Sequence, residues 1–143
     1  MGLAQSLNIL KKYCVGKKTK IIMLRTLVWK RKALVALQTY HLGDTIHALK
    51  GHLSKTPTQT SIEIGPHTHV EDSYGAYMNH SCLPNTVIHN GKILAIHTIS
   101  KGMEITYDYR RTETLLKKPF VCDFCKTYID GENTVCPTYK KEL

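Results

Sequence analysis

Hydrophobic residues in this chain are gathered in short runs instead of long amphipathic stretches. Residues 21–29, 33–37 and 45–49 are rich in β-branched and aliphatic side chains, and basic or glycine-containing segments separate them. Short runs of this kind, bounded by polar and turn-forming residues, are typical of β-strands. A fourth run at residues 61–64 precedes Gly65-Pro66, a pair that favours a turn. The first half of the chain therefore predicts four short strands.

A β-hairpin is the clearest local prediction in the second half. Asn90-Gly91 lies between the hydrophobic runs 86–89 and 92–99. Both turn residues accept positive φ angles, which match the twist of a two-residue hairpin. Another strand is expected at residues 104–107, after a turn at residues 100–102.

Two segments lack a strand pattern. Residues 51–60 combine Ser, Thr and Pro with little hydrophobicity and predict a loop. Residues 112–118 predict a short helix that stops before Pro119, because the residue before a proline disfavours helical backbone angles. Many short strands with little helix predict a mainly β fold of several small sheets.

Charge is distributed unevenly along the 143 residues, a length that fits one compact domain. The first 32 residues hold nine lysines and arginines, no acid precedes Asp44, and this accounts for the whole net charge of +9. Residues 1–20 therefore form a basic N-terminal arm, either an amphipathic helix or a disordered segment. Such an arm favours nucleic acid, anionic lipid or an acidic protein as a partner, and a solvated tail is the alternative.

Targeting signals are weak. The hydrophobic residues between 3 and 10 are interrupted by polar ones, and the run at residues 21–29 contains Arg25, so neither a secretory signal nor a transmembrane segment is expected. These features predict an intracellular protein, cytoplasmic or nuclear. The first six residues, Met1 to Ser6, match a myristoylation pattern, but so short a pattern matches by chance and membrane anchoring is not expected.

Two polar segments concentrate side chains that need hydrogen-bond partners when they are buried: Asn79-His80-Ser81-Cys82-Leu83-Pro84-Asn85 and Glu104-Ile105-Thr106-Tyr107-Asp108-Tyr109. In order and spacing, they resemble the two signature motifs of SET-domain protein lysine methyltransferases. The resemblance covers about residues 24–136. It divides the chain into the basic arm, a SET domain at residues 21–111 and a post-SET-like zinc-binding tail at residues 112–143.

The resemblance implies a SET fold with a knot-like crossing, in which the first motif is threaded near the C-terminal strand. It also implies transfer of a methyl group from S-adenosylmethionine to the ε-amine of a lysine in a protein substrate. Tyr109 matches the catalytic tyrosine that orients the lysine amine. Tyr107 stands where the family has Phe or Tyr, and its additional hydroxyl implies monomethylation. Asn79 and His80 match residues that lie against the cofactor, while Tyr77 either contacts the cofactor or fills the core.

Four cysteines form a candidate zinc site. Cys122, Cys125 and Cys136 supply three thiols and Cys82 of the first motif supplies the fourth, as a tetrahedral tetrathiolate site requires. Members of the resembled family close a post-SET tail in the same way, although the ten-residue gap before Cys136 departs from their usual spacing. A redox CxxC motif and buried free thiols are the alternatives. Cys14 lies outside this set.

One departure bears on cofactor binding. The family carries a GxG-type turn at the place occupied here by Arg31-Lys32-Ala33. Glycine usually marks a close approach of the backbone to a ligand, so side chains at these positions would partly block the cofactor site. Alternatively, Lys32 and Ala33 would border the cofactor, and the basic side chains of Arg31 and Lys32 would contact its carboxylate. The alternative function is therefore a noncatalytic SET-fold module that binds nucleic acid or an acidic protein through the basic arm.

Overall fold

A computed structural model of the chain describes residues 22–27 and 31–131, and the side chains of residues 32–131. The predicted basic arm, the myristoylation pattern, Cys14 and Cys136 lie outside the described residues. No helix in the described part of the chain is long and apolar enough to cross a membrane.

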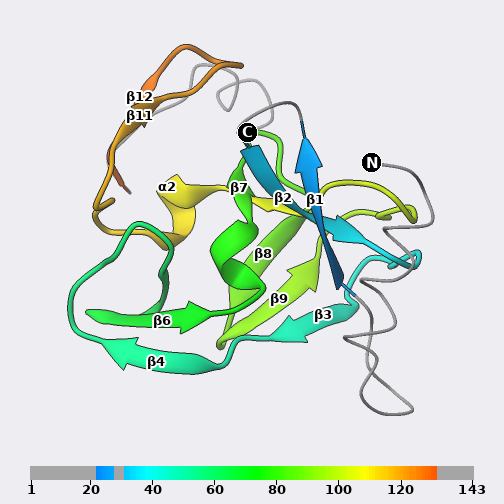
Figure 1. Ribbon diagram of the computed structural model, residues 1–143, viewed down its shortest axis with the longest axis horizontal. Coiled ribbons are helices and arrows are strands. Elements are labelled where there is room, and N and C mark those ends of the chain that lie inside the picture. The colour runs from blue at the N-terminus through cyan, green and yellow to red at the C-terminus, as the bar shows by residue number, and fades with distance from the viewer. Residues whose placement is uncertain (1–21, 28–30, 132–143) are drawn as a thin grey trace.

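The described residues form five small sheets, which confirms the predicted mainly β architecture (Figure 1). Two of them have three strands, in the orders β3-β9-β8 and β4-β6-β5, and the other three are pairs: β1-β2, β7-β10 and β11-β12. The strands are β1 (Ile22–Leu27), β2 (Arg31–Ala36), β3 (Thr45–Ala48), β4 (Gly51–Ser54), β5 (Ile62–Gly65), β6 (Thr68–Asp72), β7 (Asn79–His80), β8 (Thr86–His89), β9 (Lys92–Ala95), β10 (Thr106–Tyr107), β11 (Phe120–Val121) and β12 (Tyr128–Ile129). The described helices are the 3₁₀ helix η2 (Gly75–Tyr77) and the α-helix α2 (Tyr109–Thr112).

The predicted hairpin is confirmed. Strands β8 and β9 pair antiparallel with His89 opposite Lys92. Asn90 and Gly91 between them have φ angles of 48° and 67°, as a two-residue hairpin of this type requires.

The prediction of a loop at residues 51–60 is wrong in its first part. Gly51–Ser54 form β4, an edge strand that pairs with β6. Its side chains are mostly exposed, so the strand lacks the hydrophobic alternation by which it could have been found. Strand β6 was also not predicted, because two of its buried residues, His69 and Asp72, are polar.

The prediction of a helix at residues 112–118 is wrong as well. The helix in this region is α2, a single turn that ends at Thr112. It starts earlier because Asp108 caps it by accepting a hydrogen bond from the backbone N–H of Arg110. The strand predicted at residues 104–107 is also shorter than expected, since Glu104 makes only an isolated bridge with Val35.

Buried polar groups hold η2 in place. Asp72 at the end of β6 accepts hydrogen bonds from the backbone N–H groups of Lys50, Tyr74 and Gly75. Burial alone would raise the pKa of Asp72, but a hydrogen bond from His47, together with those from Gly75 and Lys50, lowers it to about 2. The carboxylate is therefore ionised at neutral pH, and it fixes the chain that leads into the first motif.

The two polar motifs meet in the predicted crossing. Strand β7 pairs in parallel with β10, with Asn79 opposite Thr106 and His80 opposite Tyr107. The Asn85 side chain then continues the pairing: its amide nitrogen donates to the Glu104 carbonyl at 2.8 Å, and its oxygen accepts from the Thr106 backbone N–H at 3.0 Å. One asparagine side chain thus takes the place of a strand partner. Figure 1 shows β7 near the middle of the molecule, beside the sheet that contains β8 and β9.

The segment after α2 closes on itself. Strands β11 and β12 form a hairpin, and Leu116 donates from its backbone N–H to the Asp130 carbonyl at 2.8 Å. Gly131 packs so closely that a Cβ atom would lie 2.2 Å from the Thr114 carbonyl oxygen. Residues 113–131 therefore form a closed flap whose two ends touch each other (Figure 1).

We expect Asn85→Asp to lower the free energy of unfolding by about 2 kcal/mol, because it replaces the amide donor with an oxygen that faces the Glu104 carbonyl. Denaturant unfolding followed by circular dichroism measures this. Asn90→Asp makes the same chemical change in the exposed hairpin turn and should alter stability by less than about 0.5 kcal/mol. Equal losses in the two variants would contradict the role assigned to Asn85.

Candidate active site

A cavity of about 320 Å³ opens beside the crossing of the two motifs. Its wall combines residues from the loop before β5, from η2, from β7 and β10, from α2 and from the flap. Among the residues lining it are Ser61, Met78, Asn79, His80, Tyr107, Tyr109, Glu113, Lys117, Lys118 and Phe120. The cavity therefore gathers four of the predicted site residues: Asn79, His80, Tyr107 and Tyr109.

Tyr109 is the first residue of α2 and is half-buried. Its hydroxyl donates a hydrogen bond to the Met78 carbonyl at 2.6 Å. A phenol oxygen that donates its proton in this way still offers acceptor lone pairs, and Tyr109 lines the cavity.

Tyr107 is buried next to Tyr109, with ring centroids 4.7 Å apart and the rings tilted by 43°. Its hydroxyl donates to Glu113 Oε1 at 3.2 Å. Burial raises the pKa of Tyr107 well above its ordinary value, and the neighbouring Glu113 carboxyl raises it further. The phenol is therefore neutral at physiological pH and acts as a hydrogen-bond donor to Glu113.

His80 links the cavity to the cysteines. Its Nδ1 accepts a hydrogen bond from the Tyr109 backbone N–H at 3.2 Å, and its Nε2 lies 3.5 Å from Cys82 Sγ. A neutral imidazole that accepts at Nδ1 carries its proton on Nε2, so this assignment makes His80 a donor to the Cys82 sulfur. The ring also packs edge-on against Tyr109 and Phe120, at centroid distances of 5.3 and 5.7 Å.

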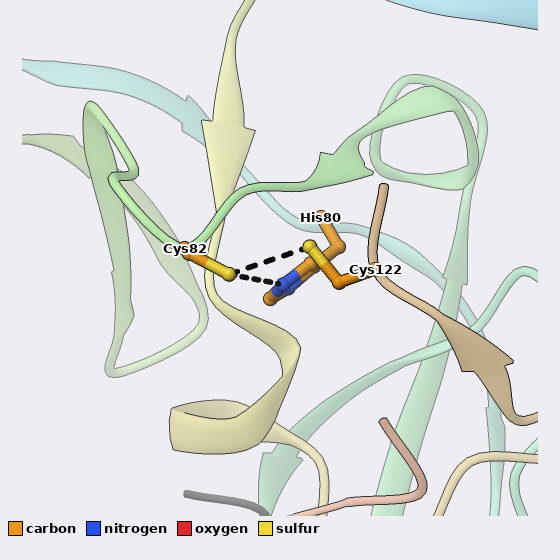
Figure 2. A group of neighbouring side chains, drawn as sticks. All are labelled: His80, Cys82 and Cys122. Carbon is orange, nitrogen blue, oxygen red and sulfur yellow. Dashed lines mark hydrogen bonds between the residues drawn. The ribbon is translucent and has the colours of Figure 1, made fainter. Parts of the chain in front are cut away.

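Three of the four predicted zinc ligands converge. Cys82 Sγ lies 3.4 Å from Cys122 Sγ and 3.2 Å from Cys125 Sγ, well beyond the roughly 2.05 Å of a disulfide bond. Four sulfurs around zinc lie about 3.8 Å apart, as bond lengths of about 2.3 Å in a tetrahedron require, so small movements suffice to fit the metal. Figure 2 shows the side chains of Cys82, Cys122 and His80 pointing toward one another.

The turn after β11 favours the thiolate form of Cys122. Burial raises the pKa of the Cys122 thiol, but the backbone N–H groups of Cys125 and Phe124 and the neighbouring thiols outweigh this effect, so the pKa is lowered. Cys122, Cys82 and His80 also lie within 4.8 Å of one another through their ligand atoms. Since the His80 proton is placed on Nε2, the fourth ligand position is left to a residue outside this group. The role of Cys136 as the fourth zinc ligand stays a prediction.

The cavity wall does not include Lys32, Ala33 or Tyr77, the remaining predicted cofactor contacts. Asn79, which does line the cavity, connects it to the strand that holds Lys32 and Ala33. Asn79 Nδ2 donates to the Lys32 carbonyl at 3.0 Å and to Glu104 Oε1 at 2.7 Å, and so joins β2 to the crossing. The Lys32 side chain is exposed, and its Nζ lies 5.3 Å from the centre of the Tyr77 ring. Ala33 is completely buried in β2. The roles of Lys32, Ala33 and Tyr77 toward a cofactor stay predictions.

Three important residues of the site were not predicted. Asp108 positions Tyr109 by capping α2, Phe120 packs on His80 and Tyr109, and Glu113 accepts from Tyr107. Asp108 could have been found as a helix-capping residue. Glu113 has no such signal, because a short helix was predicted at residues 112–118. Instead α2 is a single turn that ends just before Glu113, whose side chain is buried.

The model of the SET domain family matches residues 8–110, well over half of the chain. The chain belongs to the SET domain family.

The SET match includes both polar motifs and ends at Arg110, just after Tyr109. Members of the SET domain family are typically methyltransferases that act on protein substrates. No individual curated protein matches the chain. The cysteine flap lies beyond the matched residues, and the division into arm, SET domain and tail stays a prediction.

Proposed function

We propose that this SET domain is a protein-lysine N-methyltransferase that transfers a methyl group from S-adenosylmethionine to a lysine ε-amine. The observation that carries the proposal is the convergence of Tyr107 and Tyr109, from the second motif, with Asn79 and His80, from the first, on one cavity. The noncatalytic alternative offers no reason for two phenols to line a cavity of this size.

The cavity suits cationic reactants. The rings of Tyr107, Tyr109 and Phe120 line it, and aromatic faces attract cations. The Glu113 carboxyl and the Met78 residue that accepts from Tyr109 add acceptor oxygens, whereas Lys117 and Lys118, the basic residues in the wall, are exposed. A lysine ammonium and a sulfonium both carry one positive charge, so this set of groups fits both.

Bound S-adenosylmethionine would supply a methyl group on a positively charged sulfur, which an amine displaces. Asn79 and His80, which line the cavity, would hold it, with Phe120 offering an aromatic face. Lys32 stands between the two positions where the family has glycine, and its Nζ lies over the Tyr77 ring. The Lys32 ammonium would be available to pair with the carboxylate of the cofactor.

The protein contributes mainly position. The Tyr109 hydroxyl is fixed by Met78 and the Tyr107 hydroxyl by Glu113, and a phenol oxygen that donates one hydrogen bond can also accept one from an amine. Two fixed acceptors orient the nitrogen lone pair for in-line attack, and correct orientation can supply a large part of the rate. The Tyr107 hydroxyl also narrows the cavity, which favours addition of a single methyl group.

We further propose that zinc joins Cys82, Cys122, Cys125 and Cys136. The close approach of the three described thiols supports this, as does the His80 proton directed at the Cys82 sulfur. Zinc would tie the flap, and with it Phe120, to the first motif.

Isothermal calorimetry with S-adenosylmethionine should show binding, and radiolabelled cofactor with an array of lysine-containing peptides should show transfer. Tyr109→Phe should reduce the rate about 100-fold with little change in cofactor affinity, because it removes an orienting acceptor and leaves the ring. Tyr74→Phe, outside the cavity wall, is the matched control and should keep full activity. Failure of the unsubstituted chain to bind the cofactor would refute the proposal in favour of the binding module.

On the best peptide of the array, the lysine that the Tyr107→Phe variant does methylate should carry mixed di- and trimethylation instead of a single methyl group. Loss of the hydroxyl widens the cavity and removes the acceptor that holds the unmethylated amine. Mass spectrometry of the product distinguishes these states. A product that is mostly trimethylated already with the unsubstituted chain would contradict the assignment of Tyr107.

Metal analysis of protein purified under reducing conditions should find one zinc per chain. Cys125→Ser should lower this stoichiometry and the resistance of the flap to proteolysis, because the metal holds the flap. Cys136→Ser tests the fourth ligand, and Cys14→Ser is the matched control that should leave the zinc content unchanged. A metal-free protein with an intact flap would overturn the zinc proposal.

A further inference from the structure

A second cluster of titratable groups lies behind the tyrosines. Glu63 of β5, His69 of β6 and Glu113 after α2 are all buried, and their ligand atoms lie within 4.8 Å of one another. Only Glu113 of the three lines the cavity. Fixing the Tyr107 hydroxyl does not by itself explain why the Glu113 carboxyl is buried beside a second acid and a histidine.

Glu113 is held in place from several directions. The backbone N–H of Glu63 donates to its two oxygens, at 3.1 and 3.3 Å, and the Tyr107 hydroxyl donates to Oε1 at 3.2 Å. Its own backbone N–H donates to the Tyr109 carbonyl at 2.7 Å, across the turn of α2. The same turn thus presents Tyr109 to the cavity and Glu113 to the back of Tyr107.

The neighbours of Glu113 set its affinity for protons. Burial raises the pKa of Glu113 to about 7, hydrogen bonds from Glu63 and Tyr107 act in the opposite direction, and the charge of Glu63 adds to the rise. The Glu63 carboxylate itself faces away, toward the backbone N–H and hydroxyl of Thr114 at 2.7 and 3.0 Å. His69 Nδ1 lies 4.0 Å from Glu113 Oε2 and has no hydrogen-bond partner among the described residues.

A metal ion shared by these three residues is a weaker explanation. It would have to draw the Glu63 carboxylate away from both of its hydrogen bonds to Thr114, and Glu113 away from Tyr107. A single proton on Glu113 requires no such rearrangement.

We infer that Glu113, acting through the Tyr107 hydroxyl, is the proton acceptor that converts the substrate lysine from ammonium to amine before methyl transfer. The inference rests on the proposed function, because it requires a lysine in the cavity. Glu113 is a positioning residue for Tyr107 as well, since the same hydrogen bond fixes the hydroxyl.

The proton balance is simple. An N–H bond of the ammonium breaks as its proton passes to the Tyr107 oxygen, while the Tyr107 O–H bond breaks and its proton forms a new O–H bond with the Glu113 carboxylate. Tyrosine is unchanged, lysine becomes neutral, and Glu113 becomes a carboxylic acid. The amine lone pair is then available to attack the methyl group, and Glu113 later returns the proton to solvent.

The energetics are reasonable for such a relay. The pKa of Glu113, about 7, lies roughly 3 pH units below that of free lysine. A sulfonium beside the ammonium lowers the lysine pKa, because like charges disfavour the charged form. A base poised near the working pH is also effective, and general bases commonly contribute about 100-fold or more.

The decisive variant is Glu113→Gln, which keeps size and shape. Its amide oxygen, in the place of Oε1, still accepts from Glu63 and Tyr107, while its NH₂ faces His69 Nδ1. We expect a rate about 100-fold below that of the unsubstituted chain at pH 7.5, with unchanged cofactor binding by calorimetry. The rate of the unsubstituted chain should rise with pH through about 7 as Glu113 loses its proton. The variant should lack this limb of the pH–rate profile, and its rate should approach that of the unsubstituted chain toward pH 10, where free lysine is itself deprotonated.

Two further variants sharpen the test. Glu63→Gln removes a charge that raises the pKa of Glu113, so the limb should persist and move to lower pH. Tyr107→Phe interrupts the relay, so Tyr107→Phe combined with Glu113→Gln should transfer the first methyl group no more slowly than the slower single variant. Multiplicative losses in the double variant would overturn the relay.

An activity-independent measurement separates the two proposals. The pKa of Glu113 is about 7 when folded and near 4.5 when unfolded, so the folded chain binds the extra proton and stability should fall as the pH rises between these values. Glu113→Gln should lack this component in pH-dependent unfolding. A Glu113→Gln variant with the original rate and pH profile, or with the original stability profile, would refute the relay alone. Absence of methyl transfer by the unsubstituted chain would refute the proposed function and the catalytic use of Glu113 with it.

Discussion

The site depends on the way in which the Asn85 side chain and the β7–β10 pair hold two distant segments together. Asn85 gives the Glu104–Thr106 backbone a donor and an acceptor, while β7 adds two residues of parallel pairing. Parallel pairs this short supply little stability alone, so the side-chain bonds are needed to keep the register. A shift of the β7–β10 register by one residue would turn the Tyr107 side chain to the opposite face of the strand and remove it from the cavity. The geometry of the tyrosines is therefore a consequence of this crossing.

The crossing also joins the cavity to the cysteines. His80 belongs to β7, receives the Tyr109 N–H on one ring nitrogen and faces Cys82 with the other. Its ring packs against Phe120, which stands just before Cys122 in the flap. A displacement of the cysteine side chains would thus be transmitted by the His80 ring to Tyr109 and Phe120, which line the cavity. This coupling explains why the residues of one short motif lie at both places.

The sequence predicted the elements whose signals are local. The Asn90-Gly91 hairpin was predicted from its turn residues and the meeting of the two motifs from the family resemblance, and both are confirmed. The edge strand β4 was missed, since exposure removes its hydrophobic alternation, and the helix was misplaced because the Asp108 cap starts it early. Glu113 was beyond sequence reasoning, since its importance arises from burial behind Tyr107, which only the tertiary structure brings about. The cysteine grouping was predicted as far as Cys82, Cys122 and Cys125.

The central claim is that the crossing builds a cavity for a lysine side chain. A crystal structure of the chain with S-adenosylhomocysteine and its best lysine peptide would test it most directly. The account predicts the lysine nitrogen within hydrogen-bond distance of the Tyr107 and Tyr109 hydroxyls, inside the cavity of about 320 Å³, with Glu113 behind Tyr107. A lysine bound elsewhere on the surface, with this cavity empty, would contradict it.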